Sequence, residues 1–120
     1  MADKVVVNLA TGLEDPERVM IAFLVATAAL EQGKSVVVWC TKDAVRLGLP
    51  GEAKGEACEG CPPIERLFQQ FTEGGGELWL CPICVNSRGL ADAEKVPIAN
   101  IAGATPLWEW IGGGATVFSY

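Results

Sequence analysis

The segment KVVVNL, residues 4–9, and the segment SVVVWC, residues 35–40, decide the fold of this chain. Both are short runs rich in β-branched residues, which is typical of strands buried on both faces of a parallel sheet. Between them, Asp15 supplies a helix N-cap and Pro16 suits the first helical position, so we expect a helix from Pro16 to about Gln32. A strand, a helix and a strand joined by short links indicate a parallel crossover. The sequence therefore predicts an α/β fold.

The rest of the chain continues this alternation. The further elements that we expect are a helical turn over 41–48, a helix from Ile64 that ends before Gly74, a strand over 77–81, a helical turn reaching Arg88, a strand near 98–101, a helix from Thr105 to about Ile111 and a strand over 115–119. Residues 49–63 are rich in proline, glycine and glutamate and predict an excursion loop. We expect one domain, residues 1–120, with a mostly parallel sheet of about five strands and helices on both faces, a flavodoxin-like three-layer arrangement.

Composition narrows the classes of function. The chain has 9 Lys and Arg residues against 15 Asp and Glu residues and contains no run of basic residues, so we expect no nucleic-acid partner. The longest mostly apolar stretch, 19–30, is shorter than the roughly 20 residues that a bilayer requires, and we expect no membrane association. The first residues lack the pattern of a signal peptide, which predicts a cytoplasmic protein. The absence of histidine excludes Cys-His pairs and histidine-containing metal sites.

The five cysteines direct attention to thiol chemistry. Four of them form two Cys-x-x-Cys pairs, Cys58/Cys61 and Cys81/Cys84. Between the pairs, a predicted helix runs down the sheet and a predicted strand returns. Both pairs should then lie at the carboxyl edge of the strands, where open α/β sheets place their sites.

Cys81 has the most favourable setting for reactivity. It ends a predicted strand and precedes Pro82, so the N–H groups at a helix start would stabilise its thiolate, and Arg88 could add to that effect. The alternative is that a cysteine at a strand end is a small buried hydrophobe. We favour that alternative for Cys40, which has no neighbouring cysteine.

The stretch LWLCPICVNSRGL, residues 78–90, resembles the DsrE/DsrF-like family of sulfur-relay proteins. Together with Asn8 to Gly12 after the first strand and the strand ending at Cys40, the resemblance covers nearly the whole chain. It implies a DsrE/F-like fold and a persulfide-carrying cysteine at Cys81. A second cysteine at Cys84 also matches many members.

The resemblance implies further properties of the site and its assembly. Arg88, Asn8 and Gly12 are expected to support the cysteines, and no cofactor is expected. The partners would be proteins that donate and accept sulfur, and the chain would form a homo-oligomer, a trimer or a hexamer. Trp108 and Trp110 lie two residues apart and cannot both face the core from one helix, so an exposed tryptophan would suit a subunit interface.

The loop pair Cys58/Cys61 departs from the family pattern and leaves alternatives open. These cysteines would resolve the persulfide or form a lid over Cys81. Alternatively, Cys58, Cys61, Cys81 and Cys84 have the spacing of a four-cysteine zinc site. A dithiol redox sensor and a non-catalytic oligomer subunit are the remaining alternatives. Whether the chain is an enzyme, a sulfurtransferase acting through a persulfide, is likewise open.

Overall fold

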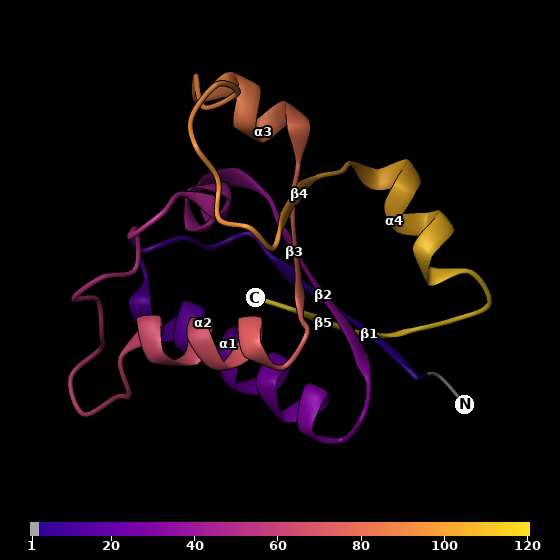
Figure 1. The fold of residues 1–120 in the computed structure, drawn as a ribbon, viewed down its shortest axis with the longest axis horizontal. Coiled ribbons are helices and arrows are strands. Elements are labelled where there is room, and N and C mark those ends of the chain that lie inside the picture. The colour runs from indigo at the N-terminus through magenta and orange to yellow at the C-terminus, as the bar shows by residue number, and fades with distance from the viewer. Residues whose placement is uncertain (1–2) are drawn as a thin grey trace.

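A five-stranded parallel sheet runs through the centre of the protein, whose structure is a computed structural model describing residues 3–120 (Figure 1). The spatial order of the strands is β4-β3-β2-β1-β5, and every neighbouring pair is parallel. The predicted α/β fold is confirmed. The strands are β1 (Lys4–Leu9), β2 (Ser35–Cys40), β3 (Glu77–Leu80), β4 (Ala99–Ile101) and β5 (Thr116–Ser119). The helices are α1 (Pro16–Glu31), the 3-10 helix η1 (Lys42–Gly48), α2 (Ile64–Glu73), α3 (Pro82–Ser87) and α4 (Ala104–Ile111).

The two segments that decide the fold lie side by side inside the sheet. β1 pairs with β2 in register from Lys4 opposite Ser35 to Leu9 opposite Cys40. The side chain of Asp15 caps α1 by accepting a hydrogen bond of 3.2 Å from the amide nitrogen of Arg18. These local signals are why the predicted bounds of this strand-helix-strand unit agree closely with the structure.

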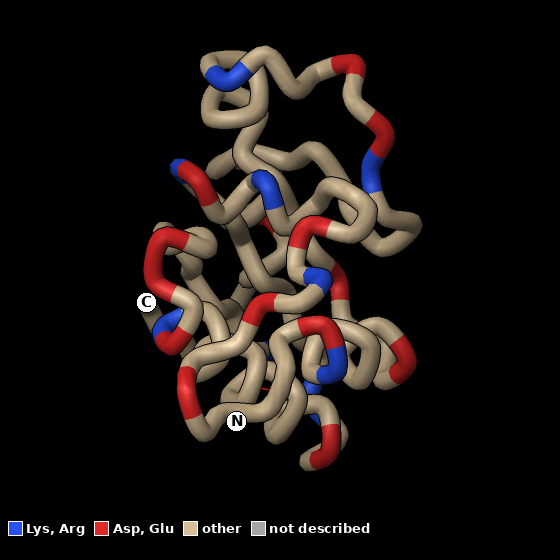
Figure 2. The backbone as a smooth tube through the Cα atoms, turned by 90° about the vertical axis from the view of Figure 1, so that its left-hand side faces the viewer, with Lys and Arg blue, Asp and Glu red and all other residues tan. Residues whose placement is uncertain are grey.

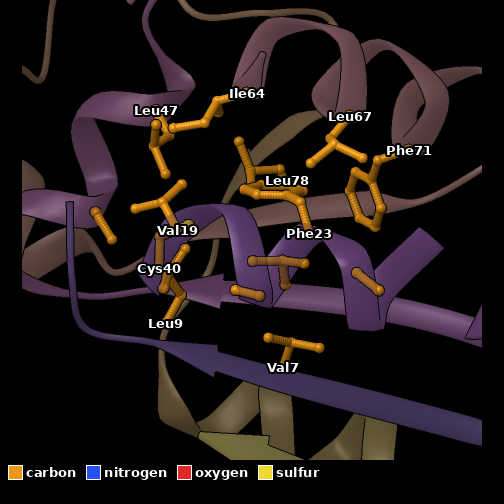
Figure 3. Packing of buried hydrophobic residues seen from close by; sticks show 14 of the residues in the cluster. Val7, Leu9, Val19, Phe23, Cys40, Leu47, Ile64, Leu67, Phe71 and Leu78 are labelled. Atoms are coloured by element: carbon orange, nitrogen blue, oxygen red, sulfur yellow. The ribbon is translucent and has the colours of Figure 1, made fainter. Parts of the chain in front are cut away.

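One face of the sheet carries the main core, under α1 and α2. Figure 3 shows Phe23 of α1 and Phe71 of α2 packed close to the strand residue Leu78. The rings of Phe23 and Phe71 lie 5.4 Å apart in an edge-to-face arrangement. The alternate strand residues that contribute to this core are Val5, Val7, Leu9, Val36, Val38, Cys40, Leu78 and Leu80.

On the opposite face of the sheet α4 lies over part of the strands, so helices lie on both faces. Trp110 packs against Trp79 of β3 with ring centroids 6.4 Å apart, and its carbonyl oxygen accepts a 2.7 Å hydrogen bond from Lys4. Trp108 is 73% exposed. The expectation that the two tryptophans face different surroundings is therefore correct.

The segment between Gly48 and Ile64 consists of turns without a helix or strand. It follows η1 and leads directly into α2, and it contains both cysteines of the first pair. Charged residues are distributed along the backbone, with Lys and Arg interspersed among Asp and Glu (Figure 2). Among residues 3–120, no helix combines the length and the apolar character needed to cross a membrane.

Candidate functional site

Cys81 lies at the junction between β3 and α3. Its amide nitrogen donates a 3.0 Å hydrogen bond to the carbonyl oxygen of Cys40, and its own carbonyl oxygen accepts one from Val85. The backbone of Cys81 is extended, and Pro82 begins the helix. The main chain is thus fixed by the sheet on one side and the helix on the other, while the half-buried thiol is free.

Cys84 is the third residue of α3, three positions after Cys81. Residues at this spacing lie on the same side of a helix. The Cys84 thiol is free and half-buried like that of Cys81. The structure therefore presents two unpaired thiols on one short helical turn at the carboxyl end of β3.

Arg88 joins α3 to η1. Its Nε lies 2.6 Å from Oδ1 of Asp43, and its Nη1 donates to the carbonyl oxygen of Cys84 at 3.3 Å and to the Ser87 hydroxyl at 3.2 Å. The Arg88 hydrogen bond lowers the pKa of Asp43 below its ordinary value. The pKa of Arg88 is raised, chiefly by that same hydrogen bond, with smaller contributions from the charges of Cys84 and Glu14. Arg88 thus pairs with Asp43 and reaches the Cys84 end of the pair through the backbone carbonyl oxygen.

Asp43 is a site residue that the sequence analysis missed. It lies three positions after the carboxyl end of β2, near the start of η1, and a charged residue close behind a buried strand is the signal that would have identified it. Its partner Arg88 lies 45 residues away in the sequence, so the pairing itself is not readable from local pattern.

Gly12 packs against the backbone of Asp43. A Cβ atom at Gly12 would lie 2.8 Å from the Asp43 carbonyl oxygen, closer than packed atoms approach. The Gly12 amide donates a 2.9 Å hydrogen bond to Oε1 of Glu14. Glu14 and Asp43 also line a small pocket of about 140 Å³ together with Arg46 and Glu52. Gly12 therefore supports the cysteines indirectly, by allowing the Asp43 backbone to pack closely against it.

Asn8 lies elsewhere. It lines an apolar hollow of about 260 Å³ beneath α4, together with Trp39 and Trp108. Because Asn8 sits one position away from the core-facing residue Leu9, its side chain belongs to the α4 face of the sheet. The structure thus brings Gly12 and Arg88 together around Asp43 but does not bring Asn8 into that group.

Cys58 and Cys61 form a disulfide across a tight turn, with their Cα atoms 5.2 Å apart. The loop that carries them lies beside the start of α2, apart from α3 at the top of the view (Figure 1). Within residues 3–120, no group of three or more Cys, Asp or Glu side chains is arranged to hold a metal ion. The two cysteine pairs therefore do not converge, either as four zinc ligands or as a lid over Cys81. The loop pair lies beside the start of α2, which packs against α1, whereas Cys81 and Cys84 lie where α3 continues from β3.

Cys40 is completely buried in the main core. Burial raises the pKa of its thiol far above the ordinary value of 9.0, because the low-polarity surroundings disfavour a thiolate. The expectation that Cys40 acts as a small core residue agrees with this position. The five cysteines therefore divide into one buried thiol, one disulfide and one pair of accessible thiols.

Comparisons with known proteins agree with this fold. An uncharacterized protein of Methanopyrus kandleri is 28% identical over 109 residues, which span 91% of this chain and 87% of that protein. The crystal structure of the ychN protein from E. coli superposes with a TM-score of 0.80 at 22% identity, covering 100% of both chains. A conserved protein of unknown function from Bacteroides thetaiotaomicron gives a TM-score of 0.62 at 18% identity, covering 98% of this chain and 95% of that one.

The sequence profile of the DsrE/DsrF-like family matches residues 3–120, nearly the entire chain. The match includes both strands that decide the fold and the segment that carries Cys81 and Cys84. The resemblance expected from the sequence is confirmed, and the chain belongs to the DsrE/DsrF-like family.

Proposed function

We propose that this protein is a sulfur carrier that holds sulfane sulfur as a persulfide on Cys81. The observation that carries the proposal is the division of the five cysteines. Cys40 is buried, and Cys58 and Cys61 are bonded to each other, which leaves Cys81 and Cys84 as available thiols. Membership of a family of sulfur-relay proteins supports the same chemistry.

Sulfur transfer needs little from the protein beyond an accessible thiolate. The Cys81 thiolate attacks the terminal sulfur of a donor persulfide, a new S–S bond forms, and the donor leaves as a thiolate. A thiolate of the acceptor then attacks the same outer sulfur and releases the Cys81 thiolate. No net oxidation occurs in either step, and no histidine base is required, which suits a chain that has none.

Cys81 is favoured over Cys84 as the carrier because of where it lies. Its backbone is fixed at the carboxyl edge of the sheet by hydrogen bonds to Cys40 and Val85, while its side chain is partly open to solvent. A donor or acceptor protein can therefore approach a thiol whose backbone is held in place. Pro82 behind it packs near Gly103, which borders the site from the loop between β4 and α4.

The partners follow from this chemistry. We propose donor and acceptor proteins that carry reactive cysteines, a cytoplasmic location, and self-association into a trimer or hexamer. The apolar side chains exposed on β5 and α4 support self-association, because Trp108, Val117 and Phe118 are 73%, 55% and 40% exposed. Light scattering at micromolar concentration tests it, and a monomer mass would contradict it.

Persulfide loading of single variants tests the carrier role. Protein lacking the loop cysteines (Cys58→Ser with Cys61→Ser) is reduced, treated with inorganic polysulfide, freed of excess reagent and weighed by mass spectrometry. We expect a Cys84→Ser variant of this background to gain one sulfur on Cys81 and a Cys81→Ser variant, in which Cys84 is the remaining accessible thiol, to gain much less, since a hydroxyl is close in size to a thiol but cannot hold sulfane sulfur.

Three outcomes separate the alternatives. Equal loading with and without Cys81 contradicts the carrier role. Loss of two hydrogens in protein that keeps both Cys81 and Cys84 and has met no polysulfide indicates a dithiol redox protein instead. No modification of any cysteine, with circular dichroism showing an intact fold, indicates a non-catalytic subunit.

A further inference from the structure

We propose that the Asp43–Arg88 pair makes Cys84 the resolving thiol of this site, the one that attacks the Cys81 persulfide and releases sulfide. This inference rests on the proposed carrier role of Cys81 and assigns a different task to the second cysteine. Asp43 and Arg88 act in it as positioning residues.

Arg88 places a cation at the Cys84 end of α3. Its side chain is only 23% exposed, and its Nη1 group donates to the carbonyl oxygen of Cys84 and to the hydroxyl of Ser87. A cation fixed next to a cysteine favours the thiolate form, which is the attacking form in thiol exchange. The same contacts tie the guanidinium to the backbone of the helix turn that carries the thiol.

Asp43 fixes the orientation of that cation. Its Oδ1 accepts the Nε hydrogen bond at 2.6 Å, a short charge-assisted contact. Lys42, directly before it, is the one non-glycine residue within residues 3–120 that has a positive φ, 53°. A non-glycine residue rarely adopts this conformation, which persists only where the surrounding structure enforces it. Asp43 follows Lys42 and contacts Arg88 at the end of α3.

The backbone of Asp43 is also closely packed. Gly12 packs against its carbonyl oxygen, with no room for a side chain. Three segments distant in the sequence, namely the loop after β1, the start of η1 and the end of α3, therefore meet at this carboxylate. An incidental surface ion pair needs none of this support.

The spacing of the two thiols suits an internal attack. Cys81 is the N-cap residue of α3 and Cys84 is its third residue, the same separation of three positions at which Cys58 and Cys61 form a disulfide. The Cys84 thiolate attacks the inner sulfur of Cys81–S–SH, a Cys81–Cys84 disulfide forms, and the bond to the outer sulfur breaks. The outer sulfur leaves as hydrosulfide with the electron pair of that bond. The two cysteine sulfurs are oxidised and the sulfane sulfur is reduced, and a thiol reductant later restores both thiols.

The charges around Cys84 determine how the step depends on pH. Arg88, which follows α3, contacts the backbone of Cys84, and the charges that act on Arg88 are those of Asp43 on η1, Cys84 itself and Glu14 in the loop before α1. Asparagine at position 43 keeps an oxygen that can accept the Arg88 hydrogen bond but removes the negative charge. Glutamine at position 88 removes the positive charge. If charge acts on Cys84, these two substitutions should therefore move the pH midpoint of sulfide release in opposite directions.

The test measures sulfide release from polysulfide-loaded protein as a function of pH, in the background without loop cysteines. We expect Arg88→Gln to move the midpoint of the release rate to higher pH and Asp43→Asn to move it to lower pH, each by about half a unit given the partial exposure of the pair. Arg18→Gln, which removes a cation from a separate ion pair with Asp15, is the matched control and should leave the midpoint unchanged. Circular dichroism checks that each variant is folded.

Two measurements separate this inference from the carrier role. Loading of Cys81 is recorded in the Cys84→Ser variant, where no internal attack is possible, and its failure contradicts the carrier role itself. If loading succeeds, sulfide release that persists without Cys84 overturns the resolving role. Midpoints that stay fixed, or that move in the same direction for Arg88→Gln and Asp43→Asn, overturn the part assigned to the Asp43–Arg88 pair.

Discussion

The amide nitrogen of Cys81 donates a hydrogen bond of 3.0 Å to the carbonyl oxygen of Cys40. Cys40 ends β2 and Cys81 directly follows the neighbouring strand β3, so their main chains meet at the carboxyl edge of the sheet. Their side chains have opposite environments, since that of Cys40 enters the core beneath α1 and α2 and that of Cys81 is partly open. This difference makes the reactivity of the two thiols separately measurable.

Alkylation of the native protein should distinguish these thiols. Without reductant, we expect an excess of iodoacetamide to modify Cys81 and Cys84 and to leave Cys40 untouched, because a fully buried neutral thiol is neither accessible nor ionised. Peptide mapping by mass spectrometry identifies the modified residues. Modification of Cys40 at the rate of Cys81 would contradict the structure, and protein unfolded in urea provides the control in which Cys40 reacts.

The burial of Cys40 should also make the protein less stable in alkali. Its folded-state pKa is raised above the ordinary 9.0, so above that pH the unfolded chain releases a proton that the folded chain keeps. The stabilising effect is complete below pH 9.0 and is lost progressively as the pH rises towards the raised value, by up to about 1.4 kcal/mol per pH unit. Urea denaturation between pH 8 and 10.5 measures the slope.

A Cys40→Ala variant separates this effect from other alkaline titrations. We expect the variant to be less stable at neutral pH, because a core residue becomes smaller, but to lose less stability between pH 9 and 10.5 than the wild type. Parallel slopes for the two proteins would show that Cys40 does not titrate differently in the folded and unfolded states.

Reduction of the Cys58–Cys61 disulfide should have a small effect on stability. The bond closes a loop of only four residues, 58–61, and such a short loop loses little entropy in the unfolded chain, about 2 kcal/mol at most. We expect the reductant to lower the urea midpoint of the wild type slightly, by no more than this stabilisation. The midpoint of the Cys58→Ser, Cys61→Ser double variant should not change when reductant is added. Complete unfolding on reduction is the contrary result.

Gly12→Ala should destabilise the protein and disturb the contact beneath Asp43. The added methyl group would meet the Asp43 carbonyl oxygen at 2.8 Å, which forces the backbone of η1 to move and costs about 1–3 kcal/mol. Gly113→Ala is the matched control, since a Cβ there meets no atom within 4 Å. Thermal unfolding compares the two, and equal melting temperatures would refute the close approach at Gly12.

The sequence alone determined the elements and their type. The β-branched runs of β1 and β2 and the Asp15-Pro16 start of α1 are local signals, and the structure has them within a residue or two of the predicted bounds. The position of Cys81 after β3 and before Pro82 was readable for the same reason. Each of these features depends on residues that are neighbours along the chain, and so does the turn that carries Cys58 and Cys61.

Only the tertiary structure decided which of these residues meet. Arg88 pairs with Asp43 across 45 residues, Asn8 faces α4 instead of the thiols, and the loop cysteines lie apart from Cys81. The physical reason is that each outcome depends on the order of the strands, on the face of the sheet to which a side chain points and on where α2 packs. Those are non-local choices made by burial of the whole core, and a motif within one segment does not contain them.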